Sequence, residues 1–213
     1  MRLKPLLTTR RKGIVATLTL ALGPGIWWAT HELRSDTQVA NIPQRICHNR
    51  ISSEKAAPLL PTKGSKYTED ADTFGGWSSL GTCEVKADDS AIYVAYQDAL
   101  GHKRNYHPKG IPVSLGKAHG SLTTEGAINL YVSCINTPRT VTKWLLIGAN
   151  ATVVDREVEA GKKLNRSTRG LRALTEFTAQ AVRDLTQDWF KCPGADQLPD
   201  GPVTIHWDKP AVP

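Results

Sequence analysis

Three histidines lie within one glycine-rich stretch of the chain, residues 98–127, and imidazole is a common ligand of transition metals. His102 and His107 are five residues apart, and His119 follows. Asp98 is the carboxylate closest to the first pair, and no cysteine stands beside them. Because nothing in the sequence would hold the imidazoles around an ion, we predict a solvated polar loop without a metal site.

The same stretch contains a basic and aromatic set that could contact an anionic polymer of the cell envelope. Cationic side chains would attract the polymer, and a tyrosine ring could stack on a sugar. The candidate contact residues are Lys103, Arg104, Tyr106, His107 and Lys109. A second basic cluster, which could attract phosphate or an acidic polymer, comprises Lys162, Lys163, Arg166, Arg169 and Arg172. A solvated charged face is the simpler interpretation of both sets.

The motifs of common catalytic and nucleotide-binding sites are missing from the sequence. Residues 76–81, GWSSLG, are one residue too long for a nucleophile elbow, and no pair of carboxylates is singled out for glycoside hydrolysis. Glycine-rich phosphate loops are absent as well. The sequence therefore predicts no catalytic residue, no metal and no cofactor. An envelope-acting hydrolase with loop 98–127 at its site is kept as the alternative to a binding module.

An uncharged apolar run over residues 13–30 indicates the compartment in which the rest of the chain works. As a helix it would measure about 27 Å, close to the roughly 30 Å hydrocarbon core of a bilayer. Five basic residues precede it, which predicts a cytoplasmic N-terminus and an outer location for residues 31–213. The predicted organisation is a cytoplasmic basic arm (1–12), a transmembrane anchor (13–30), a stalk (31–46) and an extracytoplasmic domain (47–213).

A cleaved secretory signal is the alternative for this run, since a basic start, an apolar middle and a Gly-Pro-Gly break suit both. Cleavage near its end would place Trp27 or Trp28 where a small residue is required, which favours the anchor. The anchor also explains most of the net charge of +7. Residues 1–12 hold five basic residues and no acidic one, so the rest of the chain has 22 basic against 20 acidic residues. We therefore predict membrane contact through residues 13–30 and no nucleic-acid partner.

Four cysteines, Cys47, Cys83, Cys134 and Cys192, all fall in the predicted outer domain. Their wide spacing fits no zinc motif, and an even number in an oxidising compartment predicts two disulfides. Of three possible connectivities we favour Cys47–Cys83 and Cys134–Cys192. The first would join a short helix to a strand, and the second would join the end of a long helix to another strand.

The elements behind this pairing follow from apolar periodicity. A short helix is predicted around residues 52–60, a hairpin from strands 82–86 and 91–96, a strand over 127–134 and a central strand over 144–149. Residues 155–166 are predicted to be charged and exposed. The segment from Ser167 to Cys192 has one broad apolar stripe and predicts the longest helix, and 203–207 predicts a closing strand. The fold class is therefore α+β, an antiparallel sheet of about five strands packed by one long C-terminal and one short N-terminal helix, behind the transmembrane helix.

The order of these elements resembles uncharacterised single-span extracytoplasmic membrane proteins of high-GC actinobacteria. The resemblance is carried by the basic start and apolar run, by Cys47 ahead of SSEKAAPLL, by the strands TCEV and AINLYVSC, and by a late helix ending in Cys192. It covers most of residues 10–195 and implies no particular activity or site residue. We expect a binding or interaction module at the cell envelope, with an envelope protein or polymer as partner; a structural assembly component is a third possibility.

Overall fold

The computed structural model describes residues 42–60, 66–76, 79–99, 109–135 and 144–210. Alternating apolar residues form most of the strands, and a three- to four-residue repeat forms the long helix. In chain order the elements are β1 (Arg45–Ile46), β2 (Ile51–Ser52), η1 (Ala57–Leu59), β3 (Tyr67–Asp70), β4 (Leu80–Ala87), β5 (Ser90–Asp98), β6 (Ile111–Leu115), β7 (Ala118–Leu122), β8 (Ile128–Ser133), β9 (Trp144–Ala151), α2 (Thr152–Glu159), α3 (Arg169–Arg183), η2 (Asp184–Trp189), η3 (Ala195–Gln197) and β10 (Thr204–Ile205).

The main sheet has eight strands in the order β10-β6-β7-β8-β9-β5-β4-β3, and every neighbouring pair is antiparallel. The prediction of about five strands was therefore wrong. The polar segments YTED of β3 and AHGSL of β7 lack the apolar alternation that marks a strand, and neighbouring strands supply their backbone partners. Within the predicted loop 98–127, residues 111–122 form the β6–β7 hairpin.

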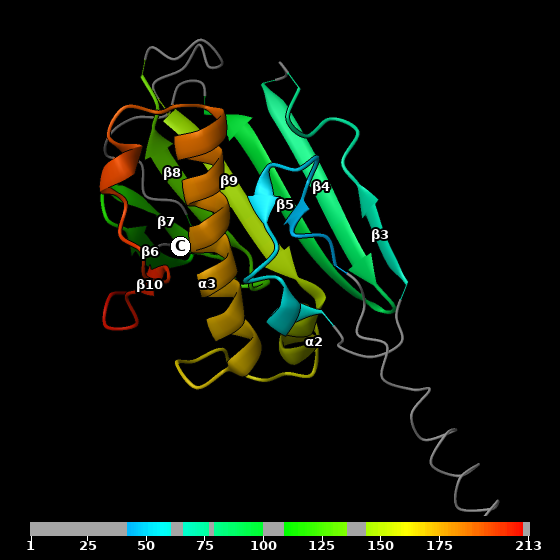
Figure 1. Cartoon of the computed structure of the whole chain (residues 1–213). Coiled ribbons are helices and arrows are strands. Elements are labelled where there is room, and N and C mark those ends of the chain that lie inside the picture. The colour runs from blue at the N-terminus through cyan, green and yellow to red at the C-terminus, as the bar shows by residue number, and fades with distance from the viewer. Residues whose placement is uncertain (1–41, 61–65, 77–78, 100–108, 136–143, 211–213) are drawn as a thin grey trace, which may run out of the picture. The chain divides into compact units, whose positions relative to one another are not determined.

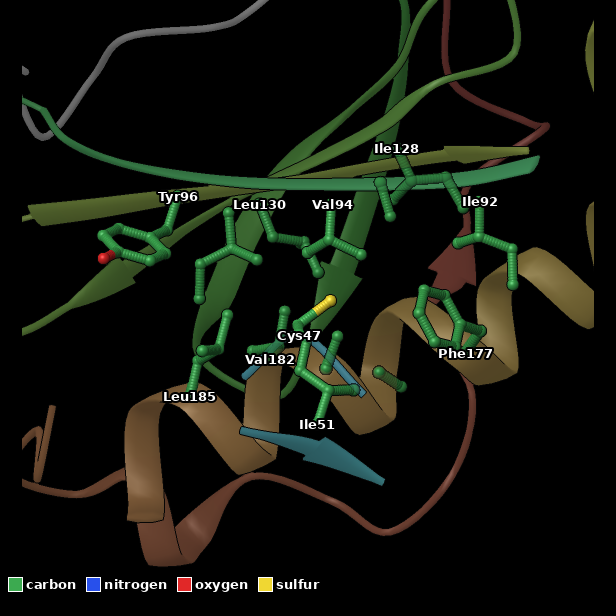
Figure 2. Close-up of a cluster of buried hydrophobic side chains, with 14 of the residues drawn as sticks. Cys47, Ile51, Ile92, Val94, Tyr96, Ile128, Leu130, Phe177, Val182 and Leu185 are labelled. Carbon is green, nitrogen blue, oxygen red and sulfur yellow. The ribbon is translucent and has the colours of Figure 1, made fainter. Parts of the chain in front are cut away.

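Helix α3 lies across one face of the sheet and covers the core (Figure 1). Figure 2 shows Phe177, Val182 and Leu185 pointing toward sheet residues such as Val94 and Leu130, and all five side chains are almost completely buried. Full burial of one such side chain stabilises the fold by about 1.5–3 kcal/mol. The long predicted helix is thus present, although its last turns, η2, have π-helical hydrogen bonding.

One smaller helical prediction was wrong. The short N-terminal helix is reduced to the 3-10 turn η1, which contains Pro58 and has only three residues. Residues 155–166 are exposed or partly exposed, as predicted, but helix α2, which begins directly at the end of β9 and includes the first of them, was not predicted. Thr152 starts that helix, accepting a hydrogen bond from the Ala91 backbone N–H at 3.0 Å. Val154, on the inner side of α2, is fully buried.

Both disulfides are present, and their pairing is the one that the order of elements favours. Cys47, in the turn of the β1–β2 hairpin, is bonded to Cys83 of β4 with a Cα–Cα distance of 5.5 Å. Cys134, directly after β8, is bonded to Cys192 after η2 with a Cα–Cα distance of 4.5 Å. One bridge therefore joins the N-terminal hairpin to the sheet, and the other joins the end of the helical layer to the sheet.

A buried carboxylate joins the N-terminal hairpin to the helical layer as well. Asp184 accepts a hydrogen bond from the Ser52 backbone N–H at 2.6 Å and another from the Gln180 side-chain amide at 2.7 Å. Burial raises the pKa of Asp184, and the two hydrogen bonds partly oppose that rise. A carboxyl group in this position connects the β1–β2 hairpin to the junction of α3 and η2.

No helix in the described ranges is long and apolar enough to cross a membrane. The fold class included such a helix over residues 13–30, and that segment lies outside the described residues, as do the basic arm and residues 31–41. The last residues of the predicted stalk belong to the folded domain. Ile42 packs against the core, and Ile46 of β1 is fully buried.

Candidate functional site

The predicted contact loop is only partly represented in the structure. Lys103, Arg104, Tyr106 and His107 lie outside the described residues, as does His102. Lys109 is described, and it is exposed just before β6. The structure therefore does not test whether these five side chains form one contact surface.

His119 is placed on β7, on the sheet face opposite α3. Its ring stacks near Tyr131 with a centroid distance of 6.2 Å and meets Trp144 edge-on at 5.4 Å. No group of three or more His, Cys, Asp or Glu side chains within the described ranges could hold a metal ion. The histidine thus takes part in an aromatic cluster, in which its ring contacts apolar surface.

A cleft of about 1110 Å³ opens where β6 begins and β7 ends. The end of α2, the connection from α2 to α3 and the segment after β10 close it on the other sides. Its apolar lining residues come from all of these segments and are Ile111, Leu122, Val158, Leu164 and Trp207. Five apolar side chains converging from distant parts of the chain leave a hydrophobic concavity on the surface.

Four cations line the same cleft: Lys162, Lys163, Arg166 and Lys209. Asp208 is the one carboxylate among its lining residues. Within the described part of the chain, none of the four cationic groups forms an ion pair or a side-chain hydrogen bond. The cleft therefore combines apolar walls with positive charge that the protein itself does not neutralise, which favours an anionic ligand.

Local hydrogen bonds fix the basic edge of the cleft. The Asn165 side chain accepts from the Ser167 backbone N–H at 2.9 Å and donates to the Lys163 carbonyl at 3.0 Å. Thr168 Oγ1 accepts from the Asn165 backbone N–H at 3.1 Å. These bonds form an Asx-type turn, so Lys163 and Arg166 are held on an ordered connection.

The opposite wall is held by the C-terminal edge strand. β10 pairs with β6 through Ile205↔Val113, and the backbone N–H of His206 donates to the Pro112 carbonyl at 2.9 Å. The side chains of Ser114 and His206 also share a hydrogen bond of 2.8 Å. This pairing places the next residue, Trp207, on the cleft.

The Ser114–His206 pair resembles the first two members of a nucleophilic triad, but its surroundings do not complete one. No carboxylate of the described residues is hydrogen-bonded to His206. Neither side chain lines the cleft. The pair links β6 to the residue that follows the edge strand β10 and gives no support to a hydrolase at this place.

The sequence pointed to one side of this site only. Lys162, Lys163 and Arg166 belong to the second basic cluster, for which a solvated face was the simpler interpretation. Arg169 does not line the cleft, and neither does Arg172. The apolar walls were missed because each of them is one residue in a different element. A possible signal was Leu164 standing between the basic residues of KKLNR.

The resemblance to single-span actinobacterial proteins stays a prediction. Comparison of the chain with protein-family models, with curated proteins and with solved structures finds no match.

Proposed function

We propose that this domain works outside the cytoplasm as a binding module of the cell envelope and that its ligand is an anionic amphiphile. The observation that carries the proposal is the cleft, in which five apolar side chains stand beside four unneutralised cations. An amphiphile of this class has an aliphatic chain that the apolar walls would remove from water and an acidic head that the cations would attract.

The two parts of the cleft would contribute differently. Burial of each methylene group of a ligand chain against partly exposed apolar residues such as Ile111 and Trp207 contributes about 0.8 kcal/mol. Lys162, Lys163 and Lys209 are exposed, so their attraction to a charged head is screened by salt and mainly gives selectivity and speed of binding. Chain length should therefore set affinity, and the sign of the head group should set specificity.

An envelope-acting enzyme remains the second candidate, and the cleft favours it less. The usual mechanism of glycoside hydrolysis needs a pair of positioned carboxyl groups, whereas Asp208 is alone among the lining residues. The exposed charges of the cleft suit holding a ligand more than activating one.

Binding of dodecanoate is the direct test of the proposed ligand class. The full chain, with both disulfides formed and no detergent micelles present, should bind dodecanoate at least about tenfold more tightly than dodecyltrimethylammonium in a calorimetric titration, a difference of about 1.4 kcal/mol. Ile111→Asp places a carboxylate on an apolar wall of the cleft and should weaken the binding of dodecanoate by about tenfold.

Ile135→Asp is the matched control, because Ile135 is 44% exposed and does not line the cleft. Lys163→Glu, at an exposed position with little risk to folding, should also weaken dodecanoate. The proposal fails if dodecanoate does not bind, or if both cleft variants bind it as the wild type does.

The outer location is supported by the two disulfides, since cytosolic thiols are kept reduced. In intact cells that produce the protein, a membrane-impermeant amine reagent should label exposed lysines such as Lys86 and Lys191. Labelling that appears only after lysis, together with free thiols in the native protein, would place the domain in the cytoplasm.

A further inference from the structure

A second, smaller cavity of about 150 Å³ lies next to the cleft and shares Asn165, Arg166 and Trp207 with it. Its other walls come from the first turns of α3 and from the C-terminal segment, through Leu171, Arg172, Thr175, Val203 and Ile205. The Val203 backbone N–H donates to the Thr175 carbonyl at 3.2 Å and thereby holds the two walls together.

Two guanidinium groups, those of Arg166 and Arg172, line this small cavity, and no acidic residue does. Neither guanidinium has an ion pair or a side-chain hydrogen bond with any other described residue. The Thr175 hydroxyl donates to the Arg172 carbonyl at 2.7 Å, which fixes the hydroxyl beside the arginine. The cavity therefore brings two exposed, unneutralised planar cations to one small, open depression.

The size of the cavity selects a compact head group. Water occupies roughly 30 Å³ per molecule in the liquid, so the small cavity has room for only a few water-sized groups and not for an aliphatic chain. The neighbouring cleft, at about 1110 Å³, has the space for a chain. Because Arg166 and Trp207 line both spaces, one ligand could place its head in the first and its chain in the second.

Two arginines match phosphate better than carboxylate. A guanidinium forms paired hydrogen bonds with either group, but one arginine already neutralises a carboxylate and contacts both of its oxygens. A phosphate monoester carries close to two negative charges at neutral pH and offers three acceptor oxygens, so a second arginine adds charge compensation and hydrogen bonds.

We infer that the ligand is a single-chain lipid phosphate, whose phosphate monoester lies between Arg166 and Arg172 and whose chain lies in the cleft. This inference rests on the proposed function, which it narrows from anionic amphiphiles in general to phosphate monoesters. Arg172 lines only the small cavity, so it is the residue expected to make the domain bind phosphate more tightly than carboxylate.

The test compares dodecyl phosphate with dodecanoate on the full chain, in the wild type and in two variants. The wild type should bind dodecyl phosphate about tenfold more tightly than dodecanoate, and inorganic phosphate far more weakly than either. Arg172→Gln should remove the preference for phosphate and leave dodecanoate nearly unchanged. Arg169→Gln is the matched control, because Arg169 belongs to the same basic cluster and lines neither cavity.

Acidification gives an independent readout. The second pKa of a phosphate monoester is about 6, whereas a carboxylic acid ionises well below that, so lowering the pH from about 7.5 to 6 removes charge mainly from dodecyl phosphate. This change should reduce the preference of the wild type for dodecyl phosphate and should have a smaller effect on Arg172→Gln. Equal binding of the two ligands, or a preference that survives in Arg172→Gln, overturns the inference while the proposed function stands. Failure of both ligands to bind overturns the proposed function as well.

Discussion

Replacement of Cys134 and Cys192 together by alanine is expected to lower the free energy of unfolding by about 4 kcal/mol. The bond closes a segment with a sequence separation of 58 residues, so its loss restores a large conformational entropy to the unfolded chain. Because a domain of this size is stable by only about 5–15 kcal/mol, the variant should be only marginally folded. Denaturant titration of the purified protein measures the loss.

The double replacement of Cys47 and Cys83 is the comparison. That bond has a sequence separation of 36 residues, and the entropy model gives it a slightly smaller effect, also near 4 kcal/mol. Substituting both partners in each case avoids a free thiol that could form a wrong bridge. A loss below about 1 kcal/mol for either pair would show that native strain or residual structure in the unfolded state cancels the entropic gain.

Gly120→Ala is expected to cost at least about 3 kcal/mol and to disrupt the pairing of β7 with β8. A Cβ atom on Gly120 would lie 1.7 Å from the Asn129 carbonyl oxygen and 2.8 Å from its carbonyl carbon. Both atoms belong to the backbone of β8, which cannot move aside without breaking the register Gly120↔Leu130. Thermal unfolding, or the yield of soluble oxidised protein if the variant does not fold, measures the effect.

Gly201→Ala is the matched control for this glycine. The corresponding Cβ atom would meet nothing within 4 Å, so the melting temperature of this variant should stay close to that of the wild type. Equal stability of Gly120→Ala and Gly201→Ala would contradict the close approach of β7 and β8 at this position.

The parts of the fold that the sequence predicts are those in which burial alternates. In β5, Ile92, Val94 and Tyr96 are buried and Tyr93 is exposed, which is the period-two pattern of a strand with one covered face. In α3, the apolar stripe coincides with the side that packs on the sheet. Because Cys192 follows that helix and Cys134 follows β8, these two predicted elements were enough to favour the observed Cys134–Cys192 bond.

The missed strands are those whose formation depends on neighbours. β7, with Gly120 and Ser121 in its middle, has little strand propensity of its own. Its backbone groups are paired because β6 lies on one side and β8 on the other. Such a strand is determined by tertiary structure, so a local pattern predicts a loop instead.

The candidate site was visible from the sequence only as charge. The three basic residues Lys162, Lys163 and Arg166 lie within five positions of one another, so they stand out in the sequence. Ile111 and Trp207, by contrast, are almost a hundred residues apart. Only the pairing of β10 with β6 brings these two apolar residues to one cleft. A cleft formed by strand ends and by segments that are distant in the sequence therefore leaves no compact motif in the chain.

Strand β9 has a consequence for the order in which this domain can be assembled. It pairs with β5 on one side and β8 on the other, so among the described strands it is the one that joins the meander β3-β4-β5 to the strands β6, β7 and β8. A chain emerging from its N-terminus has two separate ribbons with unpaired edges until residue 151 is available, and such edges invite aggregation. The Cys47–Cys83 bond can form within the first ribbon, whereas the second bond needs the chain up to residue 192. Assembly of the whole sheet is therefore a late event on a growing chain.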